Sequence, residues 1–155
     1  MKDGDLRKLR KILERCWTSE TSYYDEREYQ VRAEEGIRSF GQCYVTAKAL
    51  EEIFGWRVVE NRKVKHFWNM LPYGSEVDFT SDQFGGDGTR PIMTTEDPRE
   101  RFAEYLGTPK RPARGRERSR IFLDCVQDSL ESLGLKWGGE PFPKSAWRGQ
   151  KDENC

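Results

Sequence analysis

The chain contains a single histidine, His66, which lies between Cys43 and Asp78 in the sequence. Thiol catalysis needs a thiol that attacks, an imidazole that accepts its proton and a carboxylate that orients the imidazole. Taken alone, each residue more often has a structural role, such as a buried thiol or an aspartate that caps a turn. The three types in this order nevertheless predict a Cys-His-Asp catalytic triad.

Cys43 stands where a helix is expected to begin. Apolar residues recur at helical spacing over 43–54, and Gly55 is suited to end the helix. A thiol at a helix N-terminus beside a histidine is stabilised as the reactive thiolate. Gly41 is expected to let a substrate approach the backbone closely, and the Cys43 N–H and the Gln42 side chain are candidate donors to an oxyanion.

A hairpin is expected to carry the other two triad residues. Its two strands are predicted at residues 64–71 and 75–80. The turn, Pro72-Tyr73-Gly74, ends in the glycine that a three-residue turn favours. This turn length pairs Trp68 with Asp78 and puts His66 and Asp78 on one face, about 7–8 Å apart at the backbone. A turn of two or four residues would put them on opposite faces.

The rest of the pattern predicts further helices, one more strand and several connecting segments. The helices are expected at residues 4–16, 97–106 and 116–133, and the strand at 56–60. Residues 23–40 are expected to be irregular apart from a short helix near 25–33, residues 85–96 to form a glycine-rich connector, and residues 108–115 a linker. Asp97 is predicted to cap the helix at 97–106, because Pro and Glu follow at suitable positions.

These elements indicate an α+β fold, in which a central helix at 43–54 packs against a small antiparallel sheet with helices at its flanks. We expect one domain, residues 1–137, followed by a loose tail at residues 138–155.

Composition narrows the classes of function. The net charge is zero, which gives no overall attraction to nucleic acid or membranes. No stretch approaches the ~18 apolar residues of a membrane span, and no secretory signal is recognisable. The four cysteines are widely spaced and fit neither a zinc motif nor a disulfide scaffold, so we expect a cytoplasmic protein with reduced thiols. No cofactor or metal is expected, and the oligomeric state is left open.

Two groups of charged residues could suggest a binding site for an ion, but neither pattern favours one. Residues 110–120 hold six basic residues and one acidic residue, and a solvated linker is favoured over a phosphate-binding strip. Asp78, Asp82 and Asp87 lack the spacing of a calcium loop.

The order of Gly-x-Cys helix start, strand histidine and next-strand aspartate resembles the transglutaminase-like branch of the papain-like cysteine enzymes. More closely, three segments are similar to the YunG-like bacterial proteins, an uncharacterised family. These are Gly41-Gln42-Cys43-Tyr44-Val45-Thr46-Ala47, His66-Phe67-Trp68-Asn69 and residues 76–84, and the similarity covers residues 10–135.

The resemblance implies Cys43 as the nucleophile, His66 as the base and Asp78 as the orienting carboxylate. Supporting roles at the oxyanion or substrate are implied for four further residues: Gln42, Trp17, Trp68 and Asn69. The last two could also occlude the site.

Three classes of function follow. The first is a thiol-dependent hydrolase or acyl transferase that acts on a peptide, amide or ester. The second is a catalytically inactive interaction domain on the same scaffold. The third and weakest is anion or nucleic-acid binding through residues 110–120. The sequence does not separate hydrolysis, in which water resolves the acyl-enzyme, from transfer to an amine.

Overall fold

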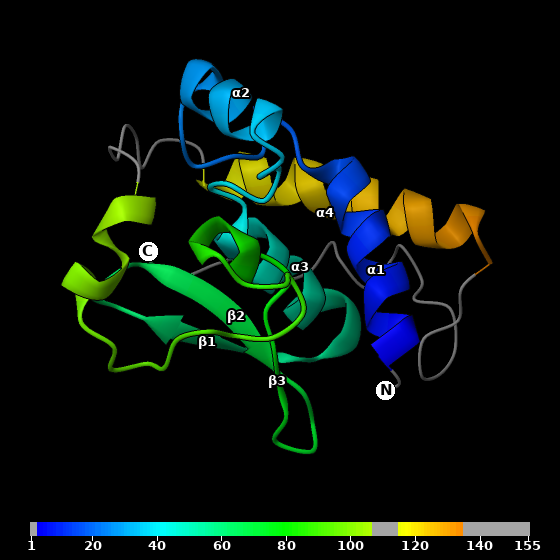
Figure 1. The fold of residues 1–155 in the computed structure, drawn as a ribbon. Coiled ribbons are helices and arrows are strands. Elements are labelled where there is room, and N and C mark those ends of the chain that lie inside the picture. Colours follow the sequence, from blue (N-terminus) through cyan, green and yellow to red (C-terminus); the bar gives the residue numbers. More distant parts are fainter. Residues whose placement is uncertain (1–2, 107–114, 135–155) are drawn as a thin grey trace.

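The computed structural model describes residues 3–106 and 115–134 (Figure 1). Its α-helices are α1 (Asp3–Cys16), α2 (Glu26–Glu34), α3 (Cys43–Phe54) and α4 (Gly115–Ser132). Two 3-10 helices, η1 (Ser81–Phe84) and η2 (Arg99–Tyr105), follow three antiparallel strands, β1 (Arg57–Asn61), β2 (His66–Met70) and β3 (Glu76–Val77). The strands form one sheet in the order β1-β2-β3, so the expected α+β class is confirmed.

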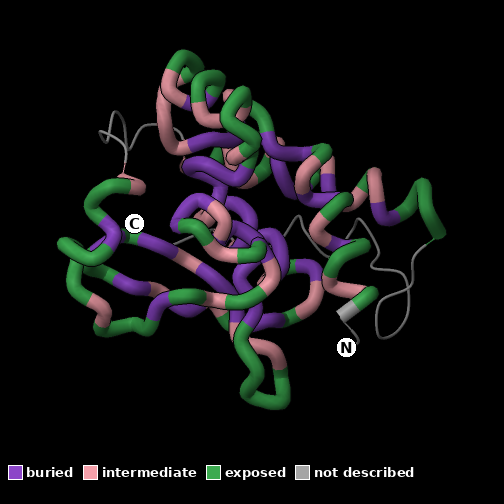
Figure 2. Tube along the Cα trace, in the orientation of Figure 1, coloured by how far each residue is buried: buried purple, intermediate pink, exposed green. Residues whose placement is uncertain are grey.

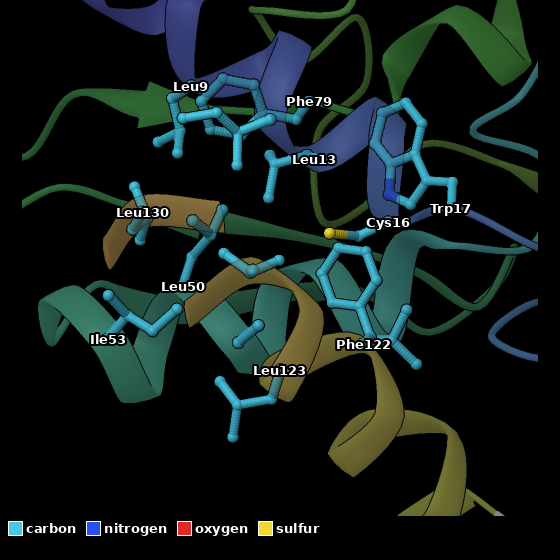
Figure 3. Close-up of a cluster of buried hydrophobic side chains, with 14 of the residues drawn as sticks. Leu9, Leu13, Cys16, Trp17, Leu50, Ile53, Phe79, Phe122, Leu123 and Leu130 are labelled. Carbon is cyan, nitrogen blue, oxygen red and sulfur yellow. The ribbon is translucent and has the colours of Figure 1, made fainter. Parts of the chain in front are cut away.

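Helix α3 is central, as its sequence predicts. It packs against β2 on one side and α4 on the other, and α1 packs on α4 (Figure 1). Both of its stripes are buried, through Val45, Ala49 and Ile53 on one and through Ala47 and Leu50 on the other. Figure 3 shows the cluster that α1, α3 and α4 form together. Each fully buried apolar side chain of this kind contributes roughly 1.5–3 kcal/mol, so this cluster holds α3 firmly against α1 and α4.

The β2–β3 hairpin has the register that a three-residue turn predicts. The observed pairs are Asn69–Val77 and Met70–Glu76. Continuing the same register places Trp68 opposite Asp78. Gly74 ends the turn with a left-handed φ of 84°, at a hairpin tip whose residues are exposed (Figure 2). His66 and Asp78 therefore lie on one face of the hairpin.

Strand β3 is shorter than the predicted strand at residues 75–80. The Asp78 N–H donates to the carbonyl of Thr89, 3.2 Å away, and not to β2. The Asp78 carboxylate accepts hydrogen bonds from the N–H and the hydroxyl of Thr80. An aspartate that captures the backbone two residues onward forms a turn, so the strand ends here.

The segment after Asp78 covers the other face of the sheet. A second core cluster joins the sheet to η1, η2 and the connector between them: Val59, Val64, Trp68, Phe84, Met93 and Phe102. The connector at 85–96 thus contributes a buried side chain, Met93.

The helix expected at 97–106 is the shorter 3-10 helix η2, and the predicted Asp97 cap is wrong. The Asp97 carboxylate accepts from the Thr94 N–H behind it instead, at 2.7 Å.

The acidic segment before α3 forms the expected short helix, α2. Asp25 caps it by accepting a hydrogen bond from the Glu28 N–H at 2.9 Å. Three predicted segments lie wholly or partly outside the described residues: the linker at 108–115, the start of the basic run at 110–120 and the tail at 138–155.

A disulfide between Cys16 and Cys125 joins α1 to α4. The expectation of reduced thiols is therefore wrong for these two residues, while Cys43 is free. Cysteines so far apart in sequence give no local signal of pairing, since only the packing of α1 on α4 brings them together. The expected cytoplasmic location rested on reduced thiols and loses that support. None of the helices in the described ranges is long and apolar enough to cross a bilayer.

Candidate active site

The first contact of the candidate site joins His66 to Asp78. Nε2 of His66 lies 2.6 Å from Oδ2 of Asp78, and both side chains are buried, with exposed fractions of 0% and 1%. The other oxygen of Asp78 accepts the Thr80 N–H at 2.9 Å and the Thr80 hydroxyl at 3.0 Å. A carboxylate held in this way fixes both the tautomer and the orientation of the imidazole.

The imidazole lies between two aromatic rings. Trp68 stacks on it with ring centroids 5.6 Å apart, and Phe84 meets it edge-on at 4.7 Å. Burial alone would lower the pKa of His66. The charge and hydrogen bond of Asp78, together with the nearby Cys43 thiol, outweigh burial and raise that pKa to about 10. An imidazole so placed is protonated at neutral pH.

The second ring nitrogen of His66 is not used by the described part of the protein. Nδ1 is buried and has no hydrogen-bond partner among the described residues. The thiol nevertheless lies near enough to contribute to the pKa of His66. The hydrogen-bond partner of the thiol is the Lys65 carbonyl, 4.0 Å from Sγ. Because Nε2 is held by Asp78, Nδ1 is the nitrogen left to exchange a proton with the thiol.

Cys43 is the first residue of α3 and is partly exposed. The preceding residue, Gln42, makes no side-chain cap, and the first turn of α3 has no acidic residue. The thiol therefore lies at the positive end of the helix dipole, and no side-chain cap or acidic side chain of the first turn offsets that charge. Lys65, just before His66, has a left-handed φ of 55°, which residues other than glycine rarely adopt. Its carbonyl lies 4.0 Å from Cys43 Sγ.

Gly41 is needed for packing. It has a φ of 72°, and a Cβ there would lie 2.5 Å from Ser22 Oγ and 2.6 Å from the Tyr24 ring. The Tyr23 N–H donates to the Gly41 carbonyl at 2.9 Å. The expectation that Gly41 leaves room for a substrate is wrong, because the segment 22–24 fills that space.

The two side chains suggested as oxyanion donors have partners inside the protein. Gln42 is fully buried and donates through Nε2 to the Thr18 carbonyl at 2.8 Å. Trp17 is fully buried and donates its indole N–H to Thr46 Oγ1 at 3.0 Å. Both contacts tie the segment after α1 to the first turn of α3. These two hydrogen bonds help to fix the position of Cys43.

The two residues suggested beside the substrate lie on opposite faces of β2. Trp68 lies against His66 and donates its indole N–H to Glu76 at 3.0 Å. Asn69 is buried on the α3 side and donates to the carbonyls of Ala47 and Trp56, at 2.9 and 3.2 Å. Asn69 thus joins α3 to the sheet and is turned away from the imidazole.

A polar clamp that sequence reasoning missed connects the loops on either side of the site. Arg10 binds Asp82 at 2.7 Å and the Phe79 carbonyl at 2.6 Å. Ser39 Oγ donates to the same Asp82 carboxylate at 2.6 Å. The clamp holds the loop before Cys43 against the loop after Asp78. The one sequence feature that indicates this clamp is an arginine, Arg10, on the inner side of an amphipathic helix.

Within the described ranges, no group of His, Cys, Asp and Glu residues is arranged to hold a metal.

Comparison with known proteins identifies the family. A model of the YunG protein family matches residues 5–127. No curated protein and no solved structure matches the chain. Since the match spans most of the sequence, the chain belongs to the YunG family, as the motifs around Cys43, His66 and Asp78 suggest.

Proposed function

We propose that this YunG family protein is a thiol-dependent hydrolase or acyl transferase that acts on an amide or ester. Cys43 is the nucleophile, His66 carries the proton and Asp78 orients the imidazole. One observation carries the proposal above all. A buried His66–Asp78 pair, 2.6 Å apart, lies near a partly exposed thiol at a helix N-terminus, and the remaining ring nitrogen of His66 has no partner among the described residues.

We also infer that the scaffold is of the transglutaminase and papain-like type. Three features support this inference: the cysteine opens a central helix, that helix packs on an antiparallel sheet, and the histidine and aspartate come from consecutive segments of one hairpin.

The first half of the reaction forms an acyl-enzyme. With a pKa raised to about 10, His66 is protonated at neutral pH and stabilises the Cys43 thiolate. Attack on the carbonyl forms the C–S bond and places negative charge on the carbonyl oxygen. The N–H groups at the start of α3, that of Cys43 among them, are the donors for this oxyanion. When the C–N or C–O bond breaks, His66 gives its proton to the leaving group.

The second half releases the acyl group. Neutral His66 now accepts a proton from water or from an amine, which attacks the thioester carbonyl. The C–S bond breaks, and the thiolate returns beside the protonated imidazole. Asp78 stays ionised throughout and keeps Nε2 of the imidazole bound.

The pH dependence of Cys43 alkylation by iodoacetamide tests the proposal. We expect Cys43 to react faster than Cys155 in the same chain well below pH 8, because the ion pair supplies thiolate there. His66→Ala should slow Cys43 and leave Cys155 unchanged. If Cys43 reacts no faster than Cys155 in the folded wild type, the proposal fails and a catalytically inactive interaction domain becomes the better interpretation.

A further inference from the structure

Arg118 of α4 lies at the edge of the proposed site. Its Nη1 donates to the Ser22 carbonyl at 3.0 Å, and its guanidinium carbon lies 5.4 Å from the centre of the Tyr23 ring. The Tyr23 N–H donates in turn to the carbonyl of Gly41, two residues before Cys43. These contacts between segments far apart in the sequence place the Arg118 guanidinium near the loop that precedes Cys43.

This guanidinium has hydrogen-bonding capacity that the protein does not use. Its Nε is buried and has no partner, and across residues 3–106 and 115–134 its hydrogen bond goes to a carbonyl and not to a carboxylate. Burial lowers the pKa of Arg118, and the groups that act against burial are Tyr23, Cys43 and Tyr44. A partly buried positive charge without a carboxylate is costly, which favours a role in binding an anion.

The surroundings suit a small organic anion. The guanidinium of an arginine is a planar fork of donors that matches the geometry of a carboxylate. Tyr44 follows Cys43 directly, is partly exposed and rests its ring edge-on against Phe67, with centroids 5.2 Å apart. Arg118 lies near enough to Cys43, Tyr23 and Tyr44 to interact with all three.

We infer that Arg118 binds a carboxylate of the substrate, so that the acyl compound attacked by Cys43 carries a negative charge near its reactive carbonyl. The inference rests on the proposed function and adds the substrate class. It also separates Arg118 from the rest of the basic run, whose described members Arg116 and Arg120 are exposed.

Two alkylating reagents of nearly equal shape test the inference. Iodoacetate carries a carboxylate, whereas iodoacetamide is uncharged. The ratio of their rates at Cys43, divided by the same ratio for the neutral thiol 2-mercaptoethanol in the same buffer, measures the attraction of an anion to the site. We expect this quotient to be about ten, because the free energy of one charge-assisted hydrogen bond corresponds to about a tenfold change in rate. Arg118→Gln should abolish most of the excess, whereas the matched control Arg120→Gln should keep it.

The outcomes separate three roles for Arg118. Loss of the iodoacetate preference with little change in the iodoacetamide rate supports the carboxylate site. An equal slowing of both reagents, or no change in either, overturns it. The iodoacetamide rate of His66→Ala tests the proposed function on its own. A wild type whose Cys43 is inert toward both reagents overturns both claims.

The wild type offers a second measurement if Arg118→Gln does not fold. Succinate should protect Cys43 from iodoacetamide in a saturable way, whereas the uncharged succinamide should not. Protection by both compounds, or by neither, overturns the carboxylate site.

Discussion

Replacing Asp78 with Asn should lower the pKa of the single histidine by roughly 1–3, because a close opposite charge shifts a pKa by about that much. In the wild type, burial lowers the pKa of His66, and the Asp78 charge and hydrogen bond raise it to about 10. The asparagine keeps the shape of the side chain and removes its charge. Burial then opposes protonation with much less compensation.

The same contact contributes to stability. A raised pKa means that the protonated imidazole is more stable in the folded chain than in the unfolded chain, by an amount on the order of a few kcal/mol. Because the folded-state pKa lies above the unfolded value, this stabilisation is fully present below pH 6.5 and is lost as the pH rises toward about 10. In a Cys43→Ser background, where no thiolate can form, the free energy of unfolding should fall over this range, and adding Asp78→Asn should remove this fall.

NMR titration of the imidazole measures the pKa directly, since the chain has one histidine and its signals need no assignment. Urea unfolding at a series of pH values measures the linked stability. Asp124→Asn, at an exposed position of α4, is the matched control and should titrate like the wild type. A wild-type pKa near 6.5, or an unchanged pKa in Asp78→Asn, would refute the reasoning.

Three further predictions concern the parts that support the site. Gly41→Ala should destabilise the fold by about 2–3 kcal/mol more than Gly36→Ala in urea unfolding, because both glycines have positive φ but only Gly41 is packed tightly; equal losses would contradict this. Asn69→Ala should lower the free energy of unfolding by about 2–3 kcal/mol, because two buried carbonyls lose their donor, and a loss below 0.5 kcal/mol in thermal unfolding would count against this role. Reduction of Cys16–Cys125, which spans 109 residues, should cost about 2–4 kcal/mol; the measurement is urea unfolding with and without reductant, and Cys125→Ser should not respond to reductant.

Local chemistry made part of the fold predictable. The hairpin register follows from Gly74 and the turn length, and the central position of α3 follows from its two apolar stripes. Both depend on residues that are close in sequence. The length of β3 depends on Thr89, whose carbonyl accepts the Asp78 N–H from across a loop, and no periodicity encodes such a contact. The start of η2 depends on a local competition, because Asp97 accepts from the Thr94 N–H behind it and not from the helix that follows.

The candidate site divides in the same way. The alternation of side chains along the hairpin brings His66 and Asp78 together, and the helix start places Cys43. The partners of Gln42 and Gly41 come from the segment at residues 18–24, whose irregular sequence gave no hint of where it packs. Arg118 was hidden within a basic run, because composition does not show which arginine turns inward.

The central claim is that Cys43 attacks an acyl carbonyl with His66 as its partner, and trapping the acyl-enzyme tests it most directly. With p-nitrophenyl acetate, we predict a burst of about one nitrophenolate per chain and one acetyl group located on Cys43 by mass spectrometry. Cys43→Ser should give no burst, and His66→Ala should slow acylation by about a hundredfold or more. Acetylation that proceeds equally in Cys43→Ser, or that leaves Cys43 unmodified in the folded wild type, would contradict the account.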